Sequence, residues 1–200
     1  MLKTVTLMDS LFLFAGKSAS GKTTIANILE AEYGHKQVES YTTRAPRYSG
    51  ERGHVFVTEE EFKNLGELAA YTFYNNHHYG TTFQQLNECS IYVIDPPGVE
   101  RLLERLPENY RPIRIIYFDA AVSTRIDRMI DRNASDMEII KRLRHDDTVD
   151  DWYGDLSKLT WHYKNLENKD VELYKIDANE NIENVLEQVL YYINQHEERE

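Results

Sequence analysis

Cysteine is almost absent from this chain: Cys89 is the only one in 200 residues. A single cysteine excludes an internal disulfide and fits a reducing compartment. The N-terminal residues are not expected to form a signal peptide, because Lys3 and Asp9 interrupt their apolar stretches and no small-residue cleavage site follows. No apolar run reaches the roughly 20 residues of a membrane span. These absences predict a cytoplasmic protein that does not contact the membrane.

Positive charge is also scarce, since 23 Lys and Arg residues face 34 Asp and Glu residues and leave a net charge of −11. A broad nucleic-acid-binding surface is therefore not expected. The length of 200 residues fits one domain that can bury a proper core. In so acidic a chain, the few places where arginine and lysine gather become the candidate anion-binding sites.

One stretch combines glycine with positive charge: residues 16–23 have the sequence G-K-S-A-S-G-K-T, the phosphate-binding P-loop pattern. The apolar run at residues 11–15 predicts a buried strand before it, and residues 24–33 predict a helix after it. Glycines let the backbone wrap around an anion, and N–H groups at a helix start point at it. Lys22 is expected to supply charge to the β- and γ-phosphates of ATP, and the Thr23 hydroxyl to ligate Mg²⁺. The predicted ATP-binding residues are Gly16, Lys17, Ser18, Ala19, Ser20, Gly21, Lys22, Thr23 and Thr24.

A second basic cluster follows the first predicted helix. Arg44 and Arg47 lie three residues apart around Pro46, so both guanidinium groups can turn toward one anion. The planar fork of arginine suits phosphate better than the lysine ammonium does. A solvated basic turn is the alternative. The position after a P-loop and its helix favours the anion site.

Apolar runs and helical periodicities alternate along the rest of the chain. Strands are expected at residues 35–40, 91–95, 111–119 and 171–176, and helices at residues 99–106, 122–132, 150–165 and from Asn179 to about 193. Residues 41–89 predict a small α+β insertion, with a helix capped by Thr58 and a strand at 69–75. The apolar and aromatic residues of 150–165, Trp161 among them, are expected to form core or a docking face rather than a base-stacking platform. This order predicts an α/β fold, a P-loop NTPase-type doubly wound parallel sheet with ligands at the carboxyl ends of its strands.

Asp95 ends the apolar run at 91–94. In P-loop folds, an acidic residue at the end of a strand faces the nucleotide and helps to place Mg²⁺. The alternative is a helix N-cap, because Pro96, Pro97 and Gly98 lead into a helix. The two roles are compatible, so Asp95 and Thr23 are the candidate metal ligands.

Two arginine-bearing helices meet at the polar break 133–135. The first carries Arg125, Arg128 and Arg132, and the second carries Lys141, Arg142 and Arg144. Such a pair predicts a lid that closes over phosphates. For Arg125 and Arg144, ordinary pairing with Asp127, Asp131, Asp146 or Asp147 remains equally open. For Arg132 and Arg142 a phosphate role is favoured.

The chain resembles the guanylate kinase family from the P-loop to about Arg142, and more weakly to its C-terminal strand and helix. The stretches that carry the resemblance are residues 40–47 (S-Y-T-T-R-A-P-R), 78–81 (H-Y-G-T), 94–98 (I-D-P-P-G) and the arginines between 128 and 142. The resemblance implies one domain over 1–200, with a core (1–40, 90–122 and 145–200), an acceptor-binding insertion (41–89) and a lid (123–144).

The resemblance also assigns roles to individual residues. Ser40, Arg44, Arg47 and Tyr79 would hold the phosphate of the acceptor, and His54 stands where the family has a further phosphate-contacting tyrosine. Thr81 would contact the acceptor base. Arg132 and Arg142 match lid arginines that bridge the donor and acceptor phosphates, and these two join Lys22 as the predicted catalytic residues. Asp95 matches an aspartate near the metal.

Two departures concern the acceptor base. Ala70 and Val93 stand where the family has carboxylates that read guanine. A site built on such hydrogen bonds discriminates by roughly 10⁴–10⁵, so their loss bears on guanine specificity.

The sequence therefore predicts an enzyme, a nucleoside monophosphate kinase with ATP as donor, Mg²⁺ as cofactor and GMP or dGMP as the first-choice acceptor. It is expected to act as a monomer or homodimer. Two alternatives stay open: a P-loop kinase of another phosphorylated small molecule, such as a sugar phosphate, and a non-catalytic guanylate-kinase-like binding module. The complete P-loop disfavours the binding module.

Overall fold

A four-stranded parallel sheet forms the centre of the molecule. The computed structural model describes residues 10–46, 49–74, 76–147, 151–167 and 169–197. The sheet has the order β6-β1-β7-β8 and consists of β1 (Leu11–Ala15), β6 (Ile91–Val93), β7 (Ile113–Asp119) and β8 (Val171–Asp177). All three strand pairs are parallel. Because such strands are covered on both faces, they are apolar throughout, as the sequence predicts.

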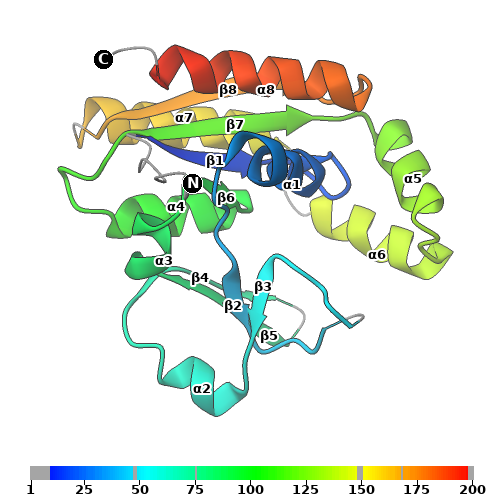
Figure 1. Ribbon diagram of the computed structural model, residues 1–200, viewed down its shortest axis with the longest axis horizontal. Helices are drawn as coiled ribbons and strands as arrows, with labels where there is room; N and C mark the ends of the chain where they lie inside the picture. The colour runs from blue at the N-terminus through cyan, green and yellow to red at the C-terminus, as the bar shows by residue number, and fades with distance from the viewer. Residues whose placement is uncertain (1–9, 47–48, 75, 148–150, 168, 198–200) are drawn as a thin grey trace, which may run out of the picture.

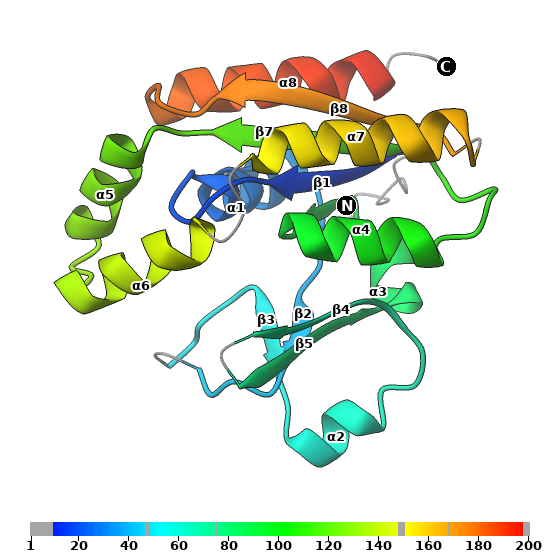
Figure 2. The ribbon, with the colours of Figure 1, turned by 180° about the vertical axis from the view of Figure 1, so that it is seen from behind.

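Helices cover both faces of this sheet (Figures 1 and 2). On one face, α1 (Lys22–Tyr33) and α8 (Ile182–Glu197) pack against Phe12 and Phe14 of β1. On the other face, α4 (Pro96–Arg105) and α7 (Trp152–Asn165) pack against Leu11 and Leu13. The predicted doubly wound parallel sheet is confirmed. None of the helices in the described ranges combines the length and apolar character that a membrane span needs.

A second, smaller sheet lies apart from the first, at the bottom of Figure 1. It has the order β3-β2-β5-β4 and is formed by β2 (Ser40–Thr42), β3 (His54–Phe56), β4 (Leu68–Tyr74) and β5 (His77–Thr82). Two short helices belong to this lobe, α2 (Glu59–Lys63) and α3 (Phe83–Asn87). Thr58 caps α2 in a capping box with Glu61, as predicted.

Two helices extend from the carboxyl end of β7: α5 (Val122–Asp131) and α6 (Asp136–Asp146). Figure 1 shows them at one side of the molecule, next to the loop between β1 and α1. Asn133, with a φ of 56°, turns the chain between them in the left-handed conformation. The Ser135 side chain then starts α6 by accepting a hydrogen bond from Glu138 N at 3.3 Å.

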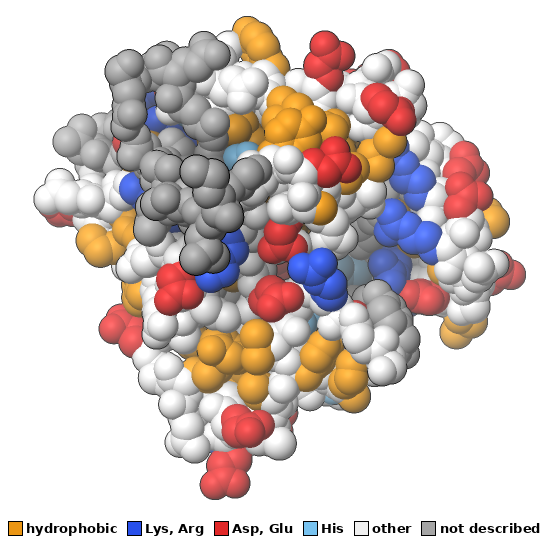
Figure 3. Space-filling view, in the orientation of Figure 1, with side chains coloured by type: hydrophobic (Ala, Val, Ile, Leu, Met, Phe, Trp, Pro, Cys, Tyr) orange, Lys and Arg blue, Asp and Glu red, His pale blue; other side chains and the backbone are white. Residues whose placement is uncertain are grey.

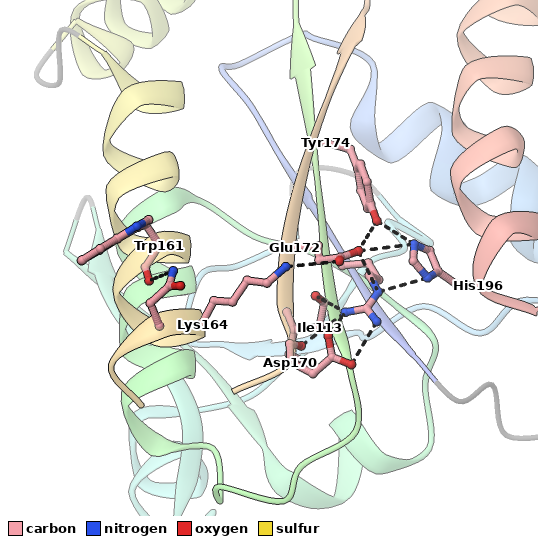
Figure 4. Close-up of polar contacts among 9 residues, drawn as sticks. Ile113, Trp161, Lys164, Asp170, Glu172, Tyr174 and His196 are labelled. Atoms are coloured by element: carbon pink, nitrogen blue, oxygen red, sulfur yellow. Dashed lines mark hydrogen bonds and ion pairs between the residues drawn. The ribbon is translucent and has the colours of Figure 1, made fainter. Parts of the chain in front are cut away.

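At the opposite end of the sheet, a polar cluster ties α8 to the amino-terminal halves of β7 and β8 (Figure 4). The buried Arg114 donates to Asp170 Oδ1 at 2.7 Å and to Oδ2 at 3.1 Å. Arg114 Nε also donates to His196 Nδ1 at 3.3 Å. Tyr174 bonds to both His196 and Glu172. The last turns of α8 are thereby anchored to the sheet.

Two local predictions are wrong. Residues 35–39 form one isolated bridge, Gln37 with Ile91, in place of the predicted strand, because the chain leaves the main sheet there to enter β2, which begins at Ser40. Asn181 starts α8 in place of Asn179, since its Oδ1 accepts from Asn184 N at 2.9 Å. The helix α7 buries Trp152 in the core and leaves Trp161 61% exposed, so its apolar residues divide between the two predicted alternatives, core and exposed face.

Candidate active site

Two glycines in the loop between β1 and α1 have positive φ angles, which other residues rarely adopt. Gly16 has a φ of 146°, and a Cβ at this position would come within 2.7 Å of the carbonyl oxygen of Phe118. Gly21 takes the left-handed conformation with a φ of 103° at the N-cap of α1. The first N–H groups of α1 therefore open onto a tight loop, which is the geometry that binds phosphate.

Lys22, the first residue of α1, folds back over this loop. Its Nζ donates to Gly16 O at 2.7 Å, to Lys17 O at 2.8 Å and to Ser20 Oγ at 3.2 Å. Desolvation lowers the pKa of Lys22 to about 8, while the nearby carboxylates of Asp146 and Asp95 oppose this shift. With a pKa near 8 the ammonium is mostly charged at neutral pH, so it can meet a phosphate.

A cavity of about 340 Å³ joins the P-loop to the small lobe. Gly16, Ser18 and Lys22 line it from the loop, and Arg142, His145 and Asp146 line it from α6. Ser40, Arg44, His54 and Tyr79 line it from the small sheet. Three parts of the chain that lie far apart in sequence thus share one hollow. These parts include four of the residues predicted to hold the acceptor phosphate.

The Arg44 side chain is held in place at the small-lobe wall. Its NH1 and NH2 groups donate to both carboxylate oxygens of Glu51, at 3.1 and 2.9 Å, and its guanidinium lies 5.3 Å from the ring centre of Phe56. Its Nε is buried and has no hydrogen-bond partner among the described residues. A buried donor without a partner favours a ligand with an acceptor oxygen. Arg47, the second arginine predicted here, lies outside the described residues.

Three more of the residues predicted at the acceptor site, Ser40, His54 and Tyr79, line the same cavity as Arg44. His54 Nδ1 lies 3.1 Å from Ser40 Oγ, and the His54 ring meets the Tyr79 ring edge-on at 5.7 Å between centroids. Thr81 does not line the cavity: it is fully buried, and its hydroxyl donates to the Tyr92 OH at 2.7 Å. Tyr92, which the sequence analysis did not single out, lines the cavity where Thr81 was expected to do so.

Ala70 and Val93 both line this cavity. The neighbouring wall is made of Tyr71, Thr72 and Tyr92, so this end offers aromatic faces and hydroxyl groups. Among the described lining residues, Asp95 and Asp146 are the acidic ones. The sequence departure at positions 70 and 93 is therefore a departure in the wall of the cavity itself.

Asp95 has the N-cap role that the sequence offered, and its side chain also lines the cavity. Its Oδ1 accepts from Gly98 N at 2.9 Å and so caps α4, whose first turn contains Pro96 and Pro97. Burial raises the pKa of this carboxyl, while the N–H of Gly98 opposes that rise. The capped carboxylate still lines the cavity, whereas Thr23 lies exposed on the first turn of α1. A carboxylate and a hydroxyl are the oxygen donors that Mg²⁺ takes in proteins, so the donor set fits this ion.

The two lid arginines predicted to act together lie at different cavities. Arg142, paired with Glu138 at 2.6 Å, lines the cavity next to the small lobe. Arg132 lines a second cavity of about 430 Å³ on the other side of the P-loop, with its NH2 3.4 Å from Thr24 Oγ1. The left-handed turn at Asn133 separates the two side chains. The structure does not bring them together.

The second cavity joins predicted P-loop residues to two residues that were not predicted at the site, Arg128 and Asn181. Ser20, Gly21 and Thr24 line it from the loop, together with Arg128 and Asn181. Arg128 donates to Ser20 O at 3.2 Å, and its pKa is lowered by burial and by the neighbouring Arg132. Two like charges held side by side next to the P-loop favour an anionic ligand. The i, i+4 spacing of these arginines was visible in the sequence, but the approach of the loop after β8 was not.

A P-loop that joins the first strand of a covered parallel sheet to its helix defines a P-loop NTPase fold. Comparison with models of known protein families gave no match. The chain is 31% identical to a guanylate kinase of Protochlamydia amoebophila over 145 residues, which cover 66% of this chain and 72% of that protein. It is 30% identical to a guanylate kinase of Geobacter metallireducens over 125 residues, which cover 52% of this chain and 62% of that protein. The crystal structure of guanylate kinase from Anaplasma phagocytophilum has the same fold, with a TM-score of 0.56 at 21% identity, over all of this chain and 90% of that one. The chain belongs to the guanylate kinase family.

Proposed function

We propose that this protein is an ATP-dependent nucleoside monophosphate kinase, with GMP or dGMP as the first acceptors to test. The observation that carries the proposal is the shared cavity. It places the P-loop lysine, Arg44 of the small lobe and Arg142 of α6 around one hollow, and the Arg44 Nε has no hydrogen-bond partner among the described residues. A donor and an acceptor phosphate can meet only where both groups of cations face the same space.

The donor triphosphate would lie in the P-loop, with its β- and γ-phosphates against Lys22. Its nucleoside would extend into the second cavity, which Arg128, Arg132 and Asn181 line on the far side of the loop. That direction leaves the γ-phosphate at the cavity that faces the small lobe.

The acceptor phosphate would bind to Arg44, Ser40 and Tyr79. Glu51 fixes the guanidinium fork of Arg44, and its Nε, which no described residue pairs with, would offer a further hydrogen bond to a phosphate oxygen. His54, within reach of Ser40, would add a donor where the resemblance expects a tyrosine.

The transfer asks for little covalent chemistry from the protein. An oxygen of the acceptor phosphate forms a bond to the γ-phosphorus, and the bond between that phosphorus and the β–γ bridging oxygen breaks, which leaves ADP and a nucleoside diphosphate. Lys22 and Arg142 would offset the negative charge during this displacement. Thr23 and Asp95 would hold Mg²⁺, which neutralises charge on the donor phosphates when bound. The acceptor phosphate is already a nucleophile, so no general base is needed.

The identity of the acceptor base is a separate matter. Among the described residues, Ala70, Val93 and the tyrosines beside them give this part of the wall no carboxylate to pair with the N1–H and amino group of guanine, and the acidic residues of the cavity are Asp95 and Asp146. This observation favours a second candidate, a kinase of another phosphorylated small molecule on the same scaffold. A non-catalytic binding module is the remaining alternative.

A coupled ADP-release screen separates these functions. It would compare GMP, dGMP, AMP, CMP, UMP and sugar phosphates with Mg·ATP, and use Lys22→Met as the inactive control. We expect turnover with at least one nucleoside monophosphate. Turnover with a sugar phosphate alone would favour the second candidate, and tight ATP binding by calorimetry without any turnover would favour the binding module.

A further inference from the structure

One buried ion pair lies directly behind the P-loop. Arg125 of α5 and Asp146 of α6 are each 1% exposed, and Arg125 NH1 donates to Asp146 Oδ2 at 2.5 Å. This settles one alternative from the sequence, because Arg125 has an acidic partner and does not line either cavity described above. The pair joins the two lid helices to each other.

Asp146 also binds the P-loop. Ser18 N donates to Asp146 Oδ2 at 3.0 Å and to Oδ1 at 3.2 Å, and the Ser18 hydroxyl donates to Oδ1 at 3.0 Å. The residues that these bonds connect are 128 positions apart in the chain. One carboxylate therefore ties the first half of the P-loop to the last residue of α6 and, through Arg125, to α5.

This arrangement is poorly explained by stability alone. A buried ion pair is often no more stabilising than two apolar side chains of similar size. The Arg125 Nε is buried without a partner in the described part of the chain, which costs further free energy. A carboxylate on the last residue of a helix also faces the negative end of the helix dipole. A site that bears these costs is expected where function needs a defined geometry.

The geometry in question is the distance between the P-loop and Arg142. Arg142 lies four residues before Asp146 on α6, so both side chains share one face of the helix, and both line the cavity with Ser18 and Lys22. A carboxylate fixed to Ser18 at one turn of α6 thereby sets where the guanidinium of the preceding turn can lie. We propose that Asp146 and Arg125 are positioning residues for phosphoryl transfer, which hold the P-loop and α6 in one alignment. This inference rests on the proposed kinase function.

The test replaces the pair by apolar side chains of similar size. In the double variant Arg125→Leu/Asp146→Leu no buried charge is left unpaired, so the fold is expected to melt within a few degrees of the wild type. We expect kcat to fall roughly 100-fold, because a misplacement of about 1 Å costs this much. The KM values for ATP and for the acceptor should change less than about threefold, since alignment matters mainly in the transition state. Wild-type kcat in a stable double variant would show that the pair is only structural.

A second ion pair of the same type supplies the matched control. The variant Arg114→Leu/Asp170→Leu removes an arginine–aspartate pair at the far end of the same sheet (Figure 4) and is expected to keep wild-type kcat and KM values. An equal loss of kcat in both double variants would assign the effect to general loosening and overturn the proposal.

Two further measurements do not depend on turnover. Amide hydrogen exchange of the P-loop should be faster in Arg125→Leu/Asp146→Leu than in the wild type without substrates, because Ser18 N loses its acceptor. Unchanged exchange would show that Asp146 does not hold the P-loop in place. This result would count against the proposal whether or not the acceptor screen finds kinase activity. ATP binding by calorimetry to Asp146→Asn should stay within about threefold of the wild type. Binding that becomes tenfold tighter would show instead that the carboxylate competes with a phosphate.

Discussion

Two buried arginines, Arg114 and Arg125, mark opposite ends of the main sheet and have different surroundings. Arg114 near the start of β7 pairs with Asp170, whose side chain is 54% exposed, and reaches His196 of α8. Arg125, in the helix that follows β7, pairs with an aspartate that is as buried as itself. The first pair reaches solvent and anchors a helix, whereas the second contacts the P-loop.

The difference follows from the direction of the strands. In a parallel sheet all carboxyl ends meet at one edge, where loops and helix N-termini can surround a ligand. Burial and charge alone do not distinguish the two arginines. Their neighbours do, because only Asp146 reaches a loop built to bind anions. Two arginine–aspartate pairs thus have different roles. The pair Arg114–Asp170 helps to attach α8 to the sheet, and we propose that the pair Arg125–Asp146 aligns α6 with the P-loop.

The largest difference in activity between the carboxyl and amino ends of the sheet is expected when a lysine is replaced at each end. We expect Lys22→Met to lower kcat by about 10³-fold or more, because it removes the charge that faces the donor phosphates. Lys164→Met removes a lysine from the amino-end cluster, where it bonds to Glu172, and should leave turnover unchanged. ADP release measures both, and circular dichroism checks that both variants fold. Near-normal turnover in Lys22→Met would remove the P-loop from the mechanism.

Replacing the aspartate of each ion pair by alanine should lower the free energy of unfolding by different amounts. Asp146→Ala leaves Arg125 buried without a counter-charge, so we expect a loss of about 3–5 kcal/mol in the free energy of unfolding. Asp170→Ala removes a half-exposed partner, and its loss should stay near about 1 kcal/mol because solvent screens the pair. Urea unfolding at pH 7 compares them. Equal losses would mean that the two environments are less different than the structure indicates.

The preference for one acceptor base over another should depend on the cavity at the carboxyl ends of the strands, and not on the cluster at their amino ends. The double variant Ala70→Glu/Val93→Asp places carboxylates in the cavity wall at the positions where the resemblance expects them. We expect the ratio of kcat/KM for GMP over AMP to rise by about 10- to 100-fold, since only guanine offers donors to both groups. The same ADP-release assay measures this ratio, and thermal melting checks the fold. An unchanged ratio in a folded variant would show that the base lies elsewhere.

The sequence predicts the local parts of this molecule well. The P-loop, the strand before it and the helix after it are contiguous, so their geometry follows from residues 11–33 alone. The prediction of Asn179 as the cap of α8 is wrong for a tertiary reason, because the Asn179 Oδ1 accepts instead from Ala121 N at 2.7 Å, and Asn181 caps the helix. The strand β5 is similarly hidden, since its sequence H-H-Y-G-T-T lacks the alternation of a half-buried strand.

The candidate site shows where prediction from sequence ends. Arg44, Ser40 and Arg142 carried recognisable patterns, and the structure brings them to one cavity. The bond from Ser18 to Asp146 links residues 128 positions apart, and no spacing rule reveals it. Aspartates at several positions were equally available to Arg125. Only the fold shows which one it meets.

The smallest predicted effect concerns acid stability at the amino end. Hydrogen bonding by Arg114 lowers the pKa of Asp170, and hydrogen bonding by Tyr174 lowers the pKa of Glu172. A carboxyl whose folded pKa lies below its unfolded value of about 4 stabilises the fold above that pH and loses this contribution as the pH falls through the folded pKa. The free energy of unfolding of Asp170→Asn should therefore fall less than that of the wild type between pH 5 and pH 2. The difference between the two should stay under about 1 kcal/mol, because the carboxylate is half-exposed. Urea unfolding at several pH values in this window measures the difference, and a variant that loses as much stability as the wild type would show that Asp170 does not couple folding to protons.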